Sequence, residues 1–109
     1  MSDTSSVLQQ VFDVIESRKG GDPDTSHTAR LFAKGTDKIA QKVGEEAVEC
    51  VIEAMKGDRE KLASESADLL FHLMVLWADQ GLAPADIWAE LARRQGISGI
   101  AEKQSRPNM

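Results

Sequence analysis

The sequence predicts an all-α protein, an antiparallel bundle of about four to five helices. The chain has 109 residues, the usual size of one domain, so we expect a single domain over residues 1–109. Apolar residues recur at helical spacing along most of the chain. The sequence has three phenylalanines, two tryptophans and no tyrosine, and few runs of β-branched residues, which argues against strands.

The first third of the chain predicts two helices separated by a polar turn. Residues 7–15 carry apolar side chains at the spacing of an amphipathic helix, and the glycines at 20–21 end that helix. Ser26 is a suitable cap for a short second helix that runs through Lys34. Gly35 then stops it.

Two long helices follow, and the short break between them predicts an antiparallel hairpin. Thr36 or Asp37 is expected to cap the first, which ends at Gly57. Asp58 is expected to cap the second, which runs to about Gln80. The first carries apolar residues at four-residue steps: Ile39, Val43, Ala47, Val51 and Met55.

The last predicted helix begins in the turn that contains Pro84 and stops near Gly96. We expect it to direct Ile87, Trp88 and Leu91 inward. From Ile97 onward the sequence has no sustained period, so we expect a mobile tail unless a ligand or a partner subunit orders it.

Composition and charge exclude several classes of protein. The formal net charge of −5 repels phosphate backbones, so we expect no nucleic-acid partner, and a phosphate ligand would need a cation as intermediary. Cys50 forms no internal disulfide, and with only His27 and His72 beside it there is no zinc ligand set. No signal peptide or membrane-spanning run is apparent, so we expect a cytoplasmic protein without a membrane partner.

The second long helix is unusually apolar. Over residues 62–78, 12 of 17 side chains are apolar and point in all directions, so this helix should be buried on most sides. Four short neighbours in one subunit would not cover that circumference, and we therefore expect a homodimer. The exception is a narrow stripe of Glu65, Asp68 and His72.

Acidic residues on both long helices suggest a metal site. If Glu46 and Glu49 face Glu65 and Asp68 across the hairpin, four carboxylates share one pocket. Buried carboxylates need a counter-charge, and oxygen ligands select Mg²⁺, with Mn²⁺ as an alternative. His72 suits a hydrogen-bonded wall beside a substrate better than a ligand position.

Other residues on the first long helix leave alternatives open. Lys34, Lys38 and Lys42 step by four toward the acidic stretch, where they would meet phosphate oxygens or pair with glutamates. A helical glycine, Gly44, indicates close approach of another backbone or a ligand. A solvated polar face would equally explain Lys38, Lys42, Glu45, Glu46, Glu49 and Glu53.

These motifs resemble a known family. Glu45-Glu46-x-x-Glu49 followed by Glu65-x-x-Asp68 is similar to the motif of the MazG-like all-α nucleoside-triphosphate pyrophosphatases. Within that superfamily, the chain most resembles the phosphoribosyl-ATP pyrophosphatase family. The segments that carry this likeness are SHTARL (26–31), KIAQKVGEEA (38–47) and ESADLLFHL (65–73). His27 departs from the pattern, which has an aromatic residue there.

The resemblance implies hydrolysis of 1-(5-phosphoribosyl)-ATP to 1-(5-phosphoribosyl)-AMP and pyrophosphate in histidine biosynthesis, with Mg²⁺. It implies Glu46, Glu49, Glu65 and Asp68 as metal ligands, and Glu45 as a further ligand or an acid that orients water. Glu45, Glu46 and Glu49 would then be the catalytic residues. The rival hypotheses are a housekeeping nucleotide pyrophosphatase of the same superfamily and a non-catalytic helical dimerisation module.

Overall fold

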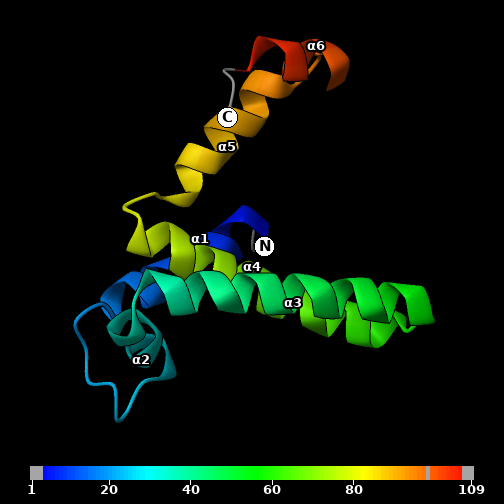
Figure 1. Ribbon diagram of the computed structural model, residues 1–109. Coiled ribbons are helices and arrows are strands. Elements are labelled where there is room, and N and C mark those ends of the chain that lie inside the picture. Colours follow the sequence, from blue (N-terminus) through cyan, green and yellow to red (C-terminus); the bar gives the residue numbers. More distant parts are fainter. Residues whose placement is uncertain (1–3, 98, 107–109) are drawn as a thin grey trace.

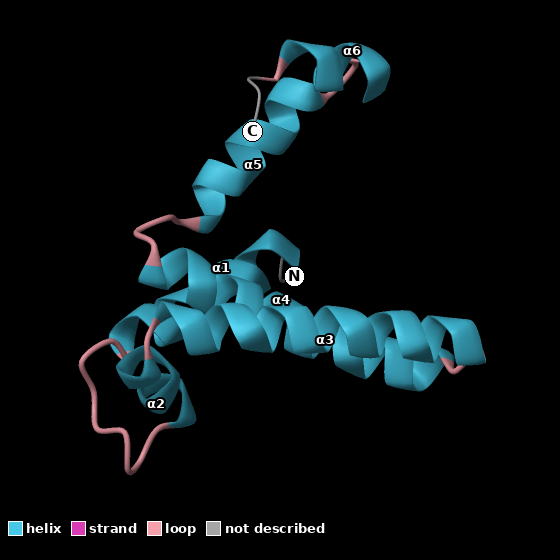
Figure 2. Ribbon diagram, in the orientation of Figure 1, coloured by secondary structure: helices cyan, strands magenta, loops and turns pink. Residues whose placement is uncertain are grey.

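The protein is all-α, as predicted. The computed structural model describes residues 4–97 and 99–106, and every regular element in them is a helix (Figures 1 and 2). There are six helices within these residues: α1 Thr4–Ser17, α2 His27–Lys34, α3 Thr36–Lys56, α4 Arg59–Asp79, α5 Pro84–Arg94 and α6 Gly99–Ser105. None of these helices is long and apolar enough to cross a membrane.

A long antiparallel hairpin of α3 and α4 dominates the fold (Figure 1). Each of the two helices has 21 residues, and only Gly57 and Asp58 separate them. Gly57 adopts a left-handed conformation with φ of 74°, which ends α3 and turns the chain back. The Asp58 carboxylate then accepts a hydrogen bond from the Lys61 amide at 3.0 Å and caps α4, as predicted.

The start of α2 is capped as predicted, but the start of α3 is not. Ser26 Oγ accepts a hydrogen bond from the Ala29 amide at 3.1 Å. The residue before α3 is Gly35, with φ of 94°, so the helix begins one residue earlier than a Thr36 cap requires and two residues earlier than an Asp37 cap requires. Those two cap predictions are wrong because the bend is at the glycine. The Thr36 hydroxyl instead donates to Asp79 Oδ2 at 2.6 Å and joins the start of α3 to the end of α4.

The hydrophobic core lies at one end of the hairpin. Seven buried side chains from α1, α2, α3 and α4 form it: Phe12, Ile15, Leu31, Ile39, Met74, Val75 and Ala78. The outer part of the hairpin extends beyond this core, so the apolar stripe on α3 runs from Ile39, which is fully buried, to Met55, which is 83% exposed. The predicted burial of α4 therefore holds only near its C-terminal end, and Leu70 is 43% exposed.

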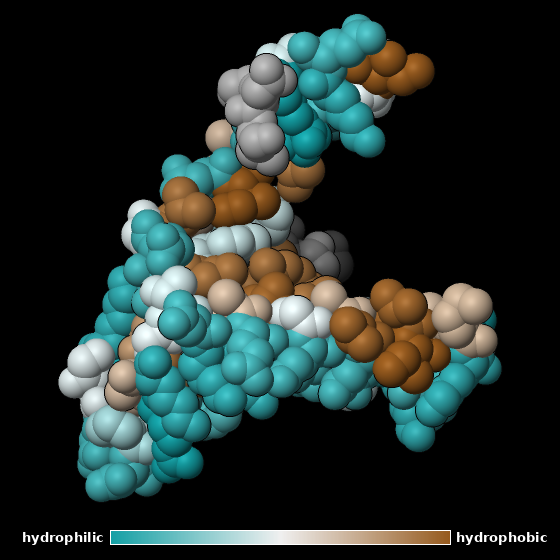
Figure 3. All heavy atoms as spheres, viewed as in Figure 1, coloured by the Kyte–Doolittle hydropathy of each residue, from teal (hydrophilic) through white to brown (hydrophobic). Residues whose placement is uncertain are grey.

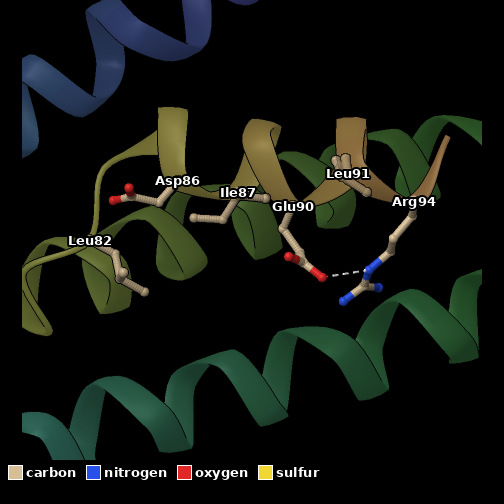
Figure 4. A pocket seen from close by; sticks show the side chains of 6 residues that line it. All are labelled: Leu82, Asp86, Ile87, Glu90, Leu91 and Arg94. Atoms are coloured by element: carbon tan, nitrogen blue, oxygen red, sulfur yellow. Dashed lines mark hydrogen bonds and ion pairs between the residues drawn. The ribbon is translucent and has the colours of Figure 1, made fainter. Parts of the chain in front are cut away.

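Helix α5 leaves the bundle at an angle (Figure 1). Of the three side chains predicted to point inward, Ile87 is half-buried, whereas the prediction is wrong for Trp88 and Leu91, which are 37% and 53% exposed. Trp88 does contact the bundle, edge-on to Trp77 with ring centroids 6.4 Å apart. Beside α5 lies a groove of about 320 Å³, along which Leu82, Ile87 and Leu91 are arranged (Figure 4).

Residues 99–105 form α6, a helix that the missing apolar period after Ile97 did not predict, and the mobility expected of this tail stays a prediction. The cause is electrostatic rather than apolar, which explains why hydrophobic periodicity missed it. Glu102 is only 4% exposed, and its carboxylate lies 2.9 Å from Arg93 of α5 and 2.7 Å from Arg106. Paired and hydrogen-bonded, this buried carboxylate fixes α6 against α5.

Candidate active site

Three carboxylates meet between the two long helices. Glu46 and Glu49 lie three residues apart on α3 and so project from neighbouring turns. The hairpin brings Glu65 of α4 opposite them, and one oxygen from each of the three lies within 4.8 Å of the others. The structure thus groups three of the four side chains predicted to share a pocket. Glu46 and Glu65 are half-buried, whereas Glu49 is exposed.

The cluster lacks a positive charge within the described part of the chain. Oε2 of Glu46 and Oε2 of Glu65 are both buried, and neither has a hydrogen-bond partner there. Hydrogen bonding with the Glu49 carboxyl, burial and the proximity of Glu46 together raise the pKa of Glu65 to about 7. A divalent cation with oxygen ligands would neutralise the cluster and coordinate the orphaned oxygens, so these residues fit such an ion.

The other two predicted acids lie outside the group of three. Asp68 is exposed and stands one turn after Glu65 on the same side of α4. Glu45 is also exposed, and it accepts a hydrogen bond from Gln41 at 3.0 Å and pairs with Lys42 at 3.8 Å. The Gln41 hydrogen bond and the nearby Lys42 lower the pKa of the Glu45 carboxyl. The roles of Asp68 and Glu45 therefore stay predictions.

His72 is the most buried polar side chain on the site's side of α4. It is 8% exposed, and its Nδ1 lies 2.8 Å from the Asp68 carbonyl oxygen. Its Nε2 is buried and has no hydrogen-bond partner in the described residues. Phe71 holds the ring edge-on at a centroid distance of 5.4 Å. This geometry suits the predicted wall, with one nitrogen fixed by the backbone and the other available to a ligand.

The three lysines line one cleft. Lys34 at the end of α2 and Lys38 and Lys42 on α3 border a cavity of about 220 Å³. His27, Arg30 and Leu31 complete its lining. Sequence reasoning missed Arg30 as a site residue, although it stands four residues before Lys34 and so continues the spacing of the lysines.

Glu53 is a second residue that sequence reasoning did not single out. Its side chain is 14% exposed, and Oε1 is buried without a hydrogen-bond partner in the described residues. The other carboxylate oxygen lies 4.0 Å from Lys56 Nζ. The sequence did contain a signal for this residue in its spacing, because positions 46, 49 and 53 share one face of α3.

Gly44 does not approach another part of the described chain. A methyl group built at this position would have no heavy atom within 4 Å beyond its own helix. The glycine borders an open hollow of about 830 Å³ whose other lining residues are Gln41, Glu45, Val48, Glu49 and Ile52. The prediction that another backbone approaches Gly44 is therefore wrong for the described part of the chain. The hollow leaves room for a ligand or a partner beside Glu49.

Comparison with known proteins identifies the family. The sequence model described as phosphoribosyl-ATP pyrophosphohydrolase matches residues 8–95. The phosphoribosyl-ATP pyrophosphatase of Azospirillum brasilense is 63% identical over 103 residues, which cover 94% of this chain and 93% of the relative. The protein of the same name from Gluconobacter oxydans is 60% identical over 101 residues, which cover 93% of this chain and 76% of the relative. The one from Paramagnetospirillum magneticum is 59% identical over 106 residues, with 97% of each covered. The chain therefore belongs to the phosphoribosyl-ATP pyrophosphohydrolase family and is a hydrolase that acts on phosphoric anhydrides.

Proposed function

We propose that this protein hydrolyses 1-(5-phosphoribosyl)-ATP to 1-(5-phosphoribosyl)-AMP and pyrophosphate in histidine biosynthesis, with a bound divalent metal. Relatives that cover nearly the whole chain carry the name of this activity. The observation that carries the metal-assisted part is the meeting of Glu46, Glu49 and Glu65, whose oxygens lie within 4.8 Å of one another. Two buried oxygens of this cluster have no partner among the described residues.

The metal would be held by Glu46, Glu49 and Glu65, with Asp68 as a fourth carboxylate one turn further along α4. Oxygen ligands favour Mg²⁺, and Mn²⁺ is the alternative. When bound, such an ion neutralises charge on the phosphate oxygens and lowers the pKa of water. A shared set of carboxylates on two packed helices keeps its geometry without loop movement, which favours a pre-organised site.

The remaining predicted residues act on substrate and water. Glu45 directly precedes Glu46 on α3, and its carboxylate would orient or deprotonate the attacking water together with Glu46 and Glu49. Lys34, Lys38 and Lys42 supply ammonium groups to phosphate oxygens. His72 forms the wall, and its free Nε2 would hydrogen-bond a group of the substrate or a water molecule.

We further propose that the enzyme is a homodimer. The support is apolar surface that this chain leaves open (Figure 3). On α3 and α4 the exposed apolar side chains are Val48, Val51, Ile52, Met55 and Leu70, and on or beside α5 they are Leu82, Trp88 and Leu91. A second copy would cover such stripes at little cost, since contiguous apolar patches on a surface mark interaction sites. A nucleotide substrate and a lone cysteine support a cytoplasmic setting.

Pyrophosphate release from purified protein tests the activity. The protein should release pyrophosphate from phosphoribosyl-ATP with Mg²⁺ or Mn²⁺ and not in EDTA. Glu49→Gln and Asp68→Asn should each reduce kcat at least 100-fold while the circular dichroism spectrum stays unchanged, because each removes a negatively charged ligand. Glu60→Gln, at an exposed position in the first turn of α4, is the matched control and should retain activity.

Two outcomes would contradict the proposal. Full activity of both ligand variants would refute the metal assignment. Faster turnover of dUTP, dCTP or oxidised triphosphates than of phosphoribosyl-ATP would favour the housekeeping pyrophosphatase instead. Rescue of a histidine auxotroph that lacks this step would test the substrate in cells.

A further inference from the structure

The cleft between α2 and α3 concentrates positive charge in an acidic protein. Its six lining residues include four permanent cations, Arg30, Lys34, Lys38 and Lys42, and no carboxylate. The whole chain has 13 basic residues and a net charge of −5, so four of the 13 at one cavity of about 220 Å³ create a strong local positive potential.

Most of this charge is not neutralised by the protein itself. Within the described residues, Arg30, Lys34 and Lys38 have no carboxylate oxygen within 4.0 Å, and only Lys42 has one, from Glu45 at 3.8 Å. The Arg30 Nε donates to the Pro23 carbonyl oxygen at 3.1 Å, which holds the guanidinium group while its terminal nitrogens stay available. Burial, together with the neighbouring His72, Lys42, Arg30 and Lys34, lowers the pKa of His27, which also lines the cleft.

The cleft and the carboxylate cluster follow each other along α3. Lys42 precedes Glu46 by one turn, and Lys38 precedes Glu49 by 11 residues, about 16 Å at the rise of an α-helix. One end of the site therefore attracts anions directly, and the other accepts them only through a metal. A ligand with two separate anionic groups matches this arrangement better than a ligand with one.

We propose that the cleft formed by His27, Arg30, Lys34, Lys38 and Lys42 binds the phosphate of the phosphoribosyl group, while the triphosphate lies at the carboxylate cluster. This inference rests on the proposed function, because phosphoribosyl-ATP carries a triphosphate on one ribose and a single phosphate on a second ribose attached to the other side of adenine. The cleft is then the specificity site that separates phosphoribosyl-ATP from ATP and other triphosphates.

The size and chemistry of the cleft fit a sugar phosphate. Its volume of about 220 Å³ is below the roughly 300–1,000 Å³ of pockets that enclose a drug-sized ligand, so it takes one end of the substrate. A guanidinium group bonds two phosphate oxygens at once, and ammonium groups add point charges around them. A phosphate monoester held in this way needs no metal.

A comparison of two substrates tests the assignment. The pair is phosphoribosyl-ATP and ribosyl-ATP, which lacks only the phosphate in question, and the variants are Arg30→Gln and Lys38→Gln. Each variant should lower kcat/KM for phosphoribosyl-ATP about 10- to 100-fold, the effect of losing a charge-assisted contact, and kcat/KM for ribosyl-ATP less than 3-fold. Arg59→Gln, at the opposite end of the hairpin, is the matched control and should change neither value.

A binding measurement without metal separates this inference from the proposed activity. In EDTA, calorimetry should show that phosphoribosyl-AMP binds at least 10-fold more tightly than AMP, and that Arg30→Gln abolishes this difference. Equal losses of kcat/KM for both substrates would overturn the inference, because the cleft would then hold the triphosphate. Equal affinities for phosphoribosyl-AMP and AMP would also overturn it. If the wild-type protein hydrolyses neither substrate, the proposed function fails, and the binding comparison alone decides the cleft's ligand.

Discussion

At the scale of single residues, the site places like-charged side chains close together, so that they repel one another unless a ligand of opposite charge is bound. Glu65 lies against Glu46 and Glu49 in partly buried surroundings, and its pKa rises from 4.5 to about 7. A few residues away on α3, lysines border a cleft without a carboxylate. Among the described residues, both features leave charge without a full counter-charge, which is typical of sites that bind charged ligands.

The raised pKa of Glu65 predicts how the metal-free protein responds to pH. The Glu65 carboxyl binds its proton more tightly in the folded state than in the unfolded state. The stability that this carboxyl contributes is therefore present below pH about 4.5, and the free energy of unfolding falls as pH rises from about 4.5 to about 7. In EDTA, the Tm of wild-type protein should therefore fall over this interval by more than the Tm of Glu65→Gln. Thermal melts at half-unit pH steps measure it.

A control separates this effect from general titration of acids. Glu60→Gln removes an exposed glutamate from the first turn of the same helix and should keep the wild-type dependence of Tm on pH. Parallel curves for the wild type and Glu65→Gln would show that the three carboxylates do not interact in solution.

At the scale of elements, backbone conformation decides where helices begin and end. Gly35 has φ of 94°, and that bend separates α2 from α3, whose residues Lys34 and Lys38 line the same cleft. Gly44, in contrast, lies inside α3, where glycine is a poor helix former. The two glycines should therefore respond oppositely to the same substitution.

Gly35→Ala should lower the free energy of unfolding by about 1–2 kcal/mol, because a side chain is strained at this φ. Gly44→Ala should raise it by about 0.5–1 kcal/mol, since neither position has a neighbour within 4 Å that would clash. Urea unfolding measures both. Destabilisation by Gly44→Ala would instead indicate that another subunit packs closely against this glycine.

The attachment of α6 to α5 depends on one buried carboxylate. Hydrogen bonds from Arg106 and Arg93 hold the pKa of Glu102 below its ordinary value, so its contribution to stability is present above pH about 4.5 and is lost as pH falls further. Glu102→Gln should accelerate amide hydrogen exchange in residues 99–105 at least 10-fold at pH 7, because it removes the charge that the arginines surround. Unchanged exchange there, or equal acceleration in the core around Val75, would contradict this role.

At the scale of the whole molecule, the chain is less compact than the sequence predicts. The outer part of the hairpin and α5 diverge from a core at one end of the fold, and both present apolar side chains (Figures 1 and 3). This divergence leaves the predicted inward face of α5 exposed, and it would suit the second copy of the proposed dimer.

Sedimentation equilibrium tests the dimer. The wild-type protein should be dimeric at micromolar concentration, and Val51→Lys with Leu91→Lys should weaken the dimer at least 100-fold, because each places a charge on an apolar surface. Val14→Lys, on an exposed position of α1, is the control. A monomeric wild-type protein, or a double variant as dimeric as the wild type, would contradict the proposal.

The sequence by itself determined the helix class, most helix ends and the candidate residues. The signals that set these features act within one or two helical turns, so they can be recognised in the sequence. They are the periodicity of apolar residues, the capping residues Ser26 and Asp58, and the glycines that end helices. The spacing of the acids also predicted that Glu46, Glu49 and Glu65 would meet, given an antiparallel hairpin.

The tertiary structure alone decided what depends on contacts between distant segments. It brought Arg30 to the lysines, buried one oxygen of Glu53, turned α5 outward and fixed α6 through Glu102. The direction of α5 and the ion pairs of Glu102 do not follow from periodicity, because an ion pair between helices or the direction of a helix after a turn leaves no repeating pattern in the sequence. Local chemistry thus specifies the elements of this enzyme, and the packing of those elements specifies its charge pattern.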